Sequence, residues 1–147
     1  MGKIMNTKKI VRIVYSSRVA GSFGFKDVKE LSMKAAENNR NLDITGLLIY
    51  GGGQFLQIIE GDSEAVNKLF FKIAKDPRHE NISIIDFDDY VIRQFKSWNM
   101  RCLILDNQEN VKSTLTKYFK DGKFDPCKLS SKEAVSFLQD LKELVVD

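Results

Sequence analysis

The stretch Ile44–Gly61, ITGLLIYGGGQFLQIIEG, constrains the fold of this chain more than any other. Two apolar runs, Ile44–Tyr50 and Gln54–Glu60, flank three consecutive glycines, which is a strong signal for a β-hairpin. The first run is apolar on both of its faces, as is typical of an internal strand that is covered above and below. The stretch therefore predicts a hairpin at the centre of the domain.

Gln57 is the unusual residue of the second run. Because side chains alternate between the two faces of a strand, Gln57 shares a face with Phe55 and Ile59. A primary amide left without hydrogen-bond partners in a core costs about 1–3 kcal/mol. Gln57 is therefore either hydrated at a sheet edge or hydrogen-bonded to a polar group held in front of it, and the second case would be a binding site.

The chain on either side of the hairpin alternates strand and helix patterns. We expect strands at Lys9–Ser16, Ile82–Phe87 and Trp98–Leu105, and helices at Asp27–Asn39 and from Asp62 or Ser63 to before Pro77. The first six elements give the α+β, ferredoxin-like βαββαβ order, with two helices on one face of a mixed sheet and an additional fifth strand. We expect the other face to be covered too, because Met100, Tyr15 and Gln57 would otherwise meet water.

Residues 106–147 supply a candidate cover for that face. They predict two amphipathic helices, the first with Val111, Leu115, Tyr118 and Phe119 on one side, the second with Ala134, Phe137, Leu138, Leu141, Leu144 and Val145. Ser130 and Glu133 offer a capping box for the second helix. Since the segment is too short for a separate domain, we expect one domain at 8–105 and a two-helix accessory segment at 106–147, which either packs on the domain or forms an oligomer contact.

Composition excludes several classes of protein. A net charge of +3 over 147 residues is too small to indicate nucleic-acid or membrane-surface binding, and no apolar run approaches the roughly 18 residues of a membrane span. Cys102 and Cys127 fit no metal-ligand spacing and are typical of reduced thiols, so we expect a cytoplasmic protein. With His79 as the single histidine and no phosphate-binding glycine loop, neither a metal site nor hydrolase or transferase chemistry is expected.

One remaining function is an RNA-recognition module, which shares the βαββαβ order and stacks bases on aromatic residues of its first and third strands. Tyr15 and Phe55 occupy roughly those strands. Against this function, Gln57 and Ile59 stand where further rings are expected, and no basic stripe flanks them.

The other remaining function is a buried site for a small flat ligand. Tyr15, Asn38, Asn39 and Gln57 are a phenol and three amides that the periodicities direct toward core faces. A heteroaromatic ring with carbonyl and N–H groups would satisfy them, and an apolar wall would bury it. Each residue alone has an ordinary structural role, such as a helix C-cap for the asparagines. The case therefore depends on the set.

In this order the set resembles the BLUF family, blue-light sensors that use FAD. The resemblance covers about Lys8–Leu105 and is carried by the motifs IVRIVYSS, ENNRNLDITGLLIYGGGQFLQIIEG, KDPRH and WNM. It implies that Tyr15 and Gln57 are the photoactive pair. Trp98 and Met100 match a signalling pair on the fifth strand.

The resemblance also implies a flavin-binding set. Asn39 matches the asparagine that holds the flavin ring, and Asn38 is its neighbour near the ribityl chain; the remaining members are Gln57, Lys72, Asp76, Arg78 and His79. Two positions depart from the family pattern. Asp43 replaces a common glycine, and Lys72 is a point charge where the family often has the fork of an arginine.

The implied function is that of a photoreceptor and not of an enzyme, because the chemistry returns to its starting composition. The chain would bind FAD non-covalently, with FMN or riboflavin as the other candidates. Light-driven electron and proton transfer from Tyr15 to the flavin would rearrange the hydrogen bonds of Gln57 and signal through the last strand and the C-terminal helices. The implied partners are further copies of the chain, as a dimer or larger ring, and a separate effector protein.

Overall fold

The computed structural model describes residues 9–21, 25–89, 91–107 and 113–144. The helices and strands follow in the order β1 (Ile10–Val19), α1 (Phe25–Asn41), β2 (Thr45–Gly51), β3 (Gln54–Asp62), α2 (Ser63–Ala74), β4 (His79–Asp89), β5 (Arg101–Ile104) and α4 (Ser131–Leu144). Short 3-10 turns occupy part of the segment between β5 and α4. No helix within the described ranges is long and apolar enough to cross a membrane.

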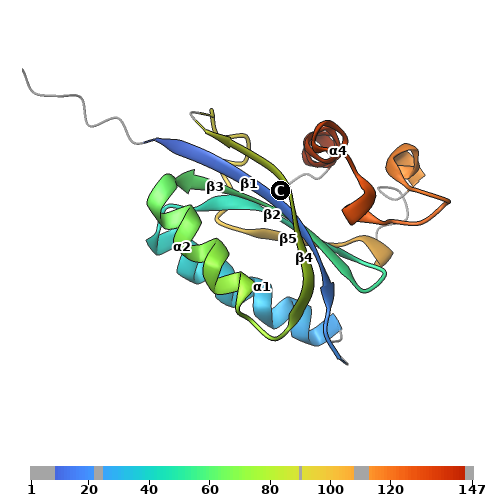
Figure 1. The fold of residues 1–147 in the computed structure, drawn as a ribbon, viewed down its shortest axis with the longest axis horizontal. Coiled ribbons are helices and arrows are strands. Elements are labelled where there is room, and N and C mark those ends of the chain that lie inside the picture. The colour runs from blue at the N-terminus through green and yellow to red at the C-terminus, as the bar shows by residue number, and fades with distance from the viewer. Residues whose placement is uncertain (1–8, 22–24, 90, 108–112, 145–147) are drawn as a thin grey trace, which may run out of the picture.

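The strands form one mixed sheet in the order β4-β1-β3-β2-β5 (Figure 1). β1 is antiparallel to both of its neighbours, β2 is antiparallel to β3, and β5 is parallel to β2. This arrangement confirms the α+β ferredoxin-like fold with a fifth strand. It also confirms that β2 is internal, as its two apolar faces predict.

The hairpin between β2 and β3 depends on glycine at two places. Gly52 and Gly53 form the turn with φ of +56° and +75°, a conformation that other residues adopt only with strain. At Gly46 the reason is close approach, since a Cβ there would lie 2.0 Å from the carbonyl oxygen of Ile58 on β3. The hairpin brings Leu48 directly opposite Gln57, and β1 brings Tyr15 opposite Gln57 from the other side.

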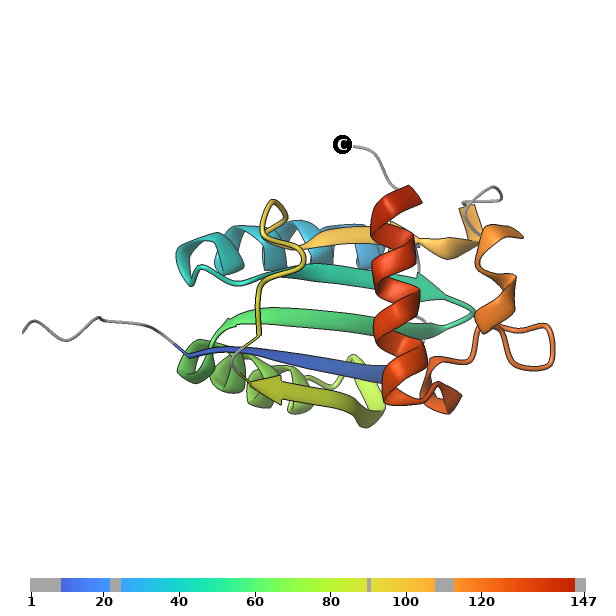
Figure 2. The same ribbon diagram turned by 90° about the horizontal axis from the view of Figure 1, so that it is seen from above.

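Each face of the sheet has its own core. α1 and α2 lie together on one face, and α4 crosses the other (Figure 2). Val28 of α1 and Val66 and Phe70 of α2 pack on the first face. On the second face, the α4 side chains Phe137, Leu138 and Leu141 pack on Leu47, Ile49, Leu56 and Ile58 of the hairpin.

The prediction that the C-terminal segment covers Tyr15, Gln57 and Met100 is wrong. Tyr15 and Met100 belong to the core under α1 and α2, and Gln57 lies between them on the same face. α4 instead covers the opposite side of the hairpin, where Leu47, Ile49, Leu56 and Ile58 form an apolar centre. The alternation along β3 was predicted correctly, but the sequence pattern did not reveal which set of side chains faces the two helices.

Two predicted element boundaries are also wrong. β5 begins at Arg101, so Trp98 and Met100 precede the strand instead of lying in it. The Trp98 carbonyl accepts a hydrogen bond from Gly46 N and the Asn99 side chain donates to the Ile44 carbonyl, so this segment joins β2 without strand geometry. β4 is longer than expected and reaches back to His79.

The C-terminal prediction is partly confirmed. α4 begins with the expected capping box, in which Ser130 Oγ accepts from Glu133 N (3.1 Å) and Glu133 Oε1 accepts from Ser130 N (2.9 Å). Of the first expected helix, Val111 lies outside the described residues, and the described part shows only a helical start at 113–114 and a 3-10 turn at Thr116–Tyr118. Val145 of the second helix also lies outside them.

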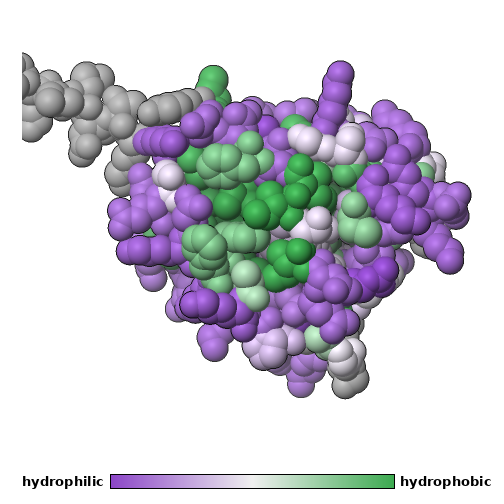
Figure 3. Space-filling view, in the orientation of Figure 1, coloured by the Kyte–Doolittle hydropathy of each residue, from purple (hydrophilic) through white to green (hydrophobic). Residues whose placement is uncertain are grey.

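Three large apolar side chains remain exposed on the α2 and β4 side of the molecule. Phe71 of α2 and Ile84 and Phe87 of β4 are 61%, 56% and 51% exposed. In the view of Figure 3, apolar surface gathers in the middle of this face, within a surround of polar side chains.

Candidate functional site

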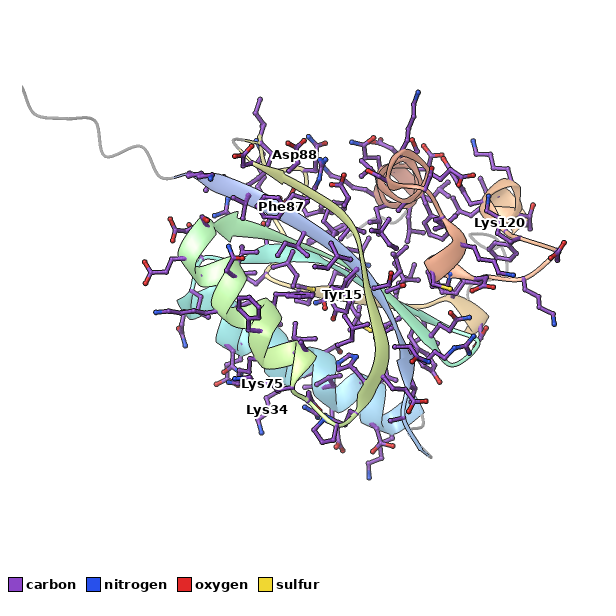
Figure 4. All side chains as sticks on the ribbon, viewed as in Figure 1. Tyr15, Lys34, Lys75, Phe87, Asp88 and Lys120 are labelled. Atoms are coloured by element: carbon purple, nitrogen blue, oxygen red, sulfur yellow. The ribbon has the colours of Figure 1, made fainter. Side chains whose placement is uncertain are left out.

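A cavity of about 250 Å³ lies between α1, α2 and the sheet. β1, β2 and β3 contribute Tyr15, Leu48 and Gln57, respectively; the helices and the turn before β4 contribute Leu31, Lys34, Ala35, Asn38, Asn39, Leu69, Lys72, Ile73, Asp76, Arg78 and His79. Figure 4 shows Tyr15 among the side chains between the strands and the two helices. Every predicted flavin-binding residue, and both predicted photoactive residues, line this one cavity.

Tyr15, Gln57 and Met100 form a buried hydrogen-bonded row. The Tyr15 hydroxyl donates to Gln57 Oε1, and Gln57 Nε2 donates to Met100 Sδ at 3.2 Å. All three side chains are at most 6% exposed. A thioether sulfur is a weak acceptor, so the orientation of the Gln57 amide depends mainly on its bond to Tyr15.

The Tyr15 phenol is held in its neutral form. Burial raises its pKa well above the ordinary value of 10.0, and the negative charge of Asp76 raises it further. The ring of Phe70 packs edge-on at 5.6 Å between centroids. Tyr15 therefore keeps its proton at any physiological pH, and that proton is directed at Gln57.

Asn39 provides an unsatisfied acceptor in the cavity wall. Its side chain is 1% exposed, and Nδ2 donates to the Asn99 carbonyl at 3.1 Å. Its Oδ1 is buried and has no hydrogen-bond partner within the described part of the chain. Leaving such an acceptor unpaired costs about 1–3 kcal/mol, so the site favours a ligand that presents an N–H group. The adjacent Asn38 lines the same cavity but is exposed.

Charged residues gather where the cavity opens to solvent. Lys34, Lys72 and Arg78 are exposed residues of its lining, against one carboxylate, Asp76. The Arg78 guanidinium and backbone N–H both donate to Asp76, which lowers the pKa of that carboxyl to about 2. The opening therefore carries a net positive charge that suits phosphate groups.

His79 lies on the inner side of this opening. Its Nδ1 shares a hydrogen bond of 2.9 Å with Ser17 Oγ on β1, and its ring packs 5.1 Å from that of Phe55. Burial lowers the pKa of His79, although Asp76 opposes the shift. The imidazole is thus favoured in its neutral form and fixed in orientation.

The lining fits a flavin. Leu31, Ala35, Leu48, Leu69 and Ile73 supply apolar walls for a flat ring, and the Asn39 and Gln57 amides can meet the polar edge of its pyrimidine. Lys34, Lys72 and Arg78 are the exposed cations of the lining, and their charges suit the phosphate groups of such a ligand. Sequence reasoning missed Lys34, although it stands one helical turn before Asn38 and so on the same side of α1.

The predicted signalling pair is divided between the two faces of the sheet. Met100 contacts Gln57, whereas Trp98 packs with the core under α4, 5.9 Å from the ring of Phe95. The Arg101 guanidinium lies 5.1 Å from the indole. The RNA-binding alternative does not survive, because Tyr15 and Phe55 are buried beneath the helices and cannot stack on bases.

Fold and site together define a ferredoxin-like domain with a cavity between its two helices that suits a flat, polar-edged ligand. The sequence matches the BLUF family, described as sensors of blue-light using FAD, over residues 10–101. The chain belongs to this family of flavin-binding blue-light sensors.

Two curated relatives are longer proteins. The blue light- and temperature-regulated antirepressor BluF of Escherichia coli K12 is 31% identical over 86 residues, which are 58% of this chain and 21% of that protein. The photoactivated adenylate cyclase subunit beta of Euglena gracilis is 35% identical over 72 residues, or 49% of this chain and 8% of the relative. The chain thus spans about a fifth or less of these relatives.

A solved structure matches along nearly its whole length. The dark-state structure of BlrB, a BLUF protein, superposes with a TM-score of 0.78 at 29% identity, covering 95% of this chain and 98% of BlrB. The similarity to BlrB therefore extends beyond residues 10–101, the part of the chain that matches the family.

Proposed function

We propose that this chain is a blue-light photoreceptor that binds FAD non-covalently in the cavity between α1 and α2. The observation that carries the proposal is the buried, partnerless Oδ1 of Asn39 in the same cavity as the Tyr15–Gln57 pair. Asn39 and Gln57 hold the ring, Asn38 and His79 contact the ribityl region, and Lys72 and Arg78 receive the phosphates. Asp76 orients Arg78 through their hydrogen bonds.

When bound, the flavin supplies the light absorption and a transient acceptor for one electron and one proton of Tyr15. The chain prepares this transfer by keeping Tyr15 protonated and dry, since burial raises its pKa. Tyr15 recovers its electron and proton at the end of the cycle. The net composition does not change, and the protein acts as a switch.

Gln57 is the group that stores the signal. Its carbonyl accepts from Tyr15 and its amide nitrogen donates to Met100. A reversed amide, or an imidic-acid tautomer, would exchange donor and acceptor ends, and a thioether cannot donate to a carbonyl in return. A change at Gln57 therefore alters the partner of Met100 directly, and biases one of two packings of the segment before β5.

The output is proposed to pass through the last strand and residues 106–147 to a separate effector protein, with 8–105 as the photosensory domain. Self-association, as a dimer or larger ring, is supported by the exposed Phe71, Ile84 and Phe87, since exposed apolar patches often mark contacts between chains. A cytoplasmic location is part of the proposal, in keeping with the free cysteines Cys102 and Cys127.

The test is the absorption spectrum of the purified protein in darkness and under blue light. We expect a yellow protein with a reversible red shift, and release of FAD on denaturation. Gln57→Leu and Tyr15→Phe should retain flavin and lose the normal shift. Gln54→Leu is the matched control, because Gln54 is buried on the same strand but faces Phe124 across the other side of the sheet. A flavin-free protein that cannot be reconstituted, or a normal photocycle in Gln57→Leu, refutes the proposal.

A further inference from the structure

Glu60 is a wholly buried carboxylate outside the flavin cavity. It lies on β3 three residues after Gln57, so its side chain points to the opposite face, the one that α4 covers. A buried carboxylate requires several hydrogen bonds or a counter-charge to be tolerated. The hydrogen-bond partners of Glu60 therefore identify the part of the structure that this carboxylate holds in place.

The partners of the Glu60 carboxylate are two backbone N–H groups of the segment between β4 and β5 and, at 3.5 Å, the hydroxyl of Thr45 on β2. Gln94 N donates to both carboxylate oxygens, at 3.0 and 2.8 Å, and Phe95 N donates at 2.9 Å. The Arg93 guanidinium donates to Thr45 Oγ1 at 3.0 Å and to the backbone carbonyl of Glu60 at 3.3 Å. Its positive charge therefore lies near the carboxylate. Burial raises the pKa of Glu60, and these amides and the charge of Arg93 oppose the shift.

The same segment is bound to α4 from the other side. Lys142, in the last turn of α4, donates from Nζ to the Gln94 carbonyl, and its ammonium lies 5.6 Å from the ring centroid of Phe95. Phe95 is 1% exposed and packs against Trp98. One peptide unit and one aromatic ring thus connect the buried carboxylate of β3 to the end of α4.

We propose that Glu60 is a positioning residue that fixes the Gln94–Trp98 segment to β3 and, through the Gln94 carbonyl and Lys142, sets the docking of the C-terminal turn of α4. Because Glu60 and Gln57 share one strand, a rearrangement at Gln57 moves the anchor of this segment as well. This last step rests on the light response proposed above. The role of Glu60 in the docking of α4 does not depend on that light response.

The test measures amide hydrogen exchange of Leu141–Leu144 in the full chain, in darkness and under blue light. In darkness, Glu60→Gln and Lys142→Met should each speed exchange of this turn about threefold to tenfold, as expected for the loss of one hydrogen bond. Since the two residues act in series, the exchange rate of the double variant should not exceed that of either single variant. Lys142→Arg, which keeps a donor, should restore protection.

Matched controls are Glu64→Gln on α2 and Lys132→Met at the start of α4, both at exposed positions. Both should exchange as the wild type does. If Glu60→Gln does not fold, Glu60→Asp replaces it, since it keeps the charge but shortens the reach. The proposal is overturned if Glu60→Gln exchanges at the wild-type rate, or if the increases in exchange rate caused by the two substitutions add up in the double variant.

The illuminated samples separate this proposal from the photoreceptor itself. We expect the wild type to show a light–dark difference in exchange at the end of α4, and Glu60→Gln and Lys142→Met to lose it while keeping the full absorption shift. If the wild type shows the absorption shift but no light–dark difference in hydrogen exchange at the end of α4, transmission by this route is refuted. A wild type without any shift refutes the photoreceptor, and the dark samples still decide whether Glu60 positions α4.

Discussion

The amide nitrogen of Gln57 lies 3.2 Å from the sulfur of Met100, and this contact joins the centre of the sheet to the segment that leads into β5. The carbonyl end of the same amide is bound by Tyr15. Gln57 is therefore held between a strong donor and a weak acceptor: Tyr15 mainly sets the orientation of the amide, and Met100 adds a smaller preference for the same orientation. The sulfur is the part of this row that can be removed without touching the photoactive pair.

Met100→Leu should retain flavin but change the balance between the two orientations of Gln57. Leucine has nearly the same volume but accepts no hydrogen bond, so the observed orientation loses a bond worth at most about 1 kcal/mol, a factor of about five in population. The change should appear in the dark-state absorption maximum and in the rate of recovery after illumination. Met33→Leu is the control, since Met33 is 66% exposed on α1; an equal effect there would contradict the assigned role of the sulfur.

Asn39→Ala should weaken flavin binding far more than Asn38→Ala. Asn39 lines the cavity and carries a buried, partnerless oxygen, whereas Asn38 is exposed. Loss of a buried hydrogen bond of about 1–3 kcal/mol corresponds to a loss of roughly fivefold to 150-fold in affinity. Titration of the flavin-free protein with FAD measures both constants. Similar losses in the two variants would count against Asn39 as the ring-binding residue.

Much of the fold follows from periodicity. The glycine turn, the alternation along Gln54–Glu60 and the helical stripe of α2 each predict an element that the structure contains. The sheet face on which the helices lie was not predicted, because both faces of β2 are apolar and alternation alone does not say which one α1 and α2 cover. That choice depends on the handedness and packing of the whole βαββαβ unit.

The candidate site was predicted as a set, but its geometry was not. Asn38 and Asn39 are adjacent in sequence and about 100° apart around a helix, so one is exposed and the other buried. Trp98 and Met100 were expected on one strand, where residues two apart share a face. They lie on opposite sides because regular strand geometry begins only at Arg101.

Gly46→Ala should destabilise the protein severely, because the added methyl group would lie 2.0 Å from the Ile58 carbonyl oxygen and 3.1 Å from the end of Met100. β2 and β3 would have to separate, at a cost of about 3 kcal/mol or more. Gly52→Ala is the matched control: its Cβ meets nothing within 4 Å, so only the strain of φ +56° remains, about 1 kcal/mol. Urea unfolding of both variants measures the difference, and equal midpoints would contradict the close approach at Gly46.

Tyr15 should make the stability of the protein fall at high pH. Burial raises the pKa of Tyr15 in the folded state, so its contribution is fully present below the ordinary value of 10.0 and is lost as the pH rises further, because only the unfolded chain releases this proton. The contribution to the free energy of unfolding should fall by up to about 1.4 kcal/mol per pH unit above pH 10. Tyr15→Phe lacks this contribution but keeps the lysines and the other tyrosines. The difference between the two proteins in urea unfolding from pH 8 to about 11 therefore isolates the contribution of Tyr15.

The variant should be the less stable protein at pH 8, since Gln57 loses its donor, and the difference in free energy of unfolding should narrow as the pH rises. Parallel curves for the two proteins would mean that Tyr15 ionises equally well folded and unfolded, and that the phenol is not kept dry.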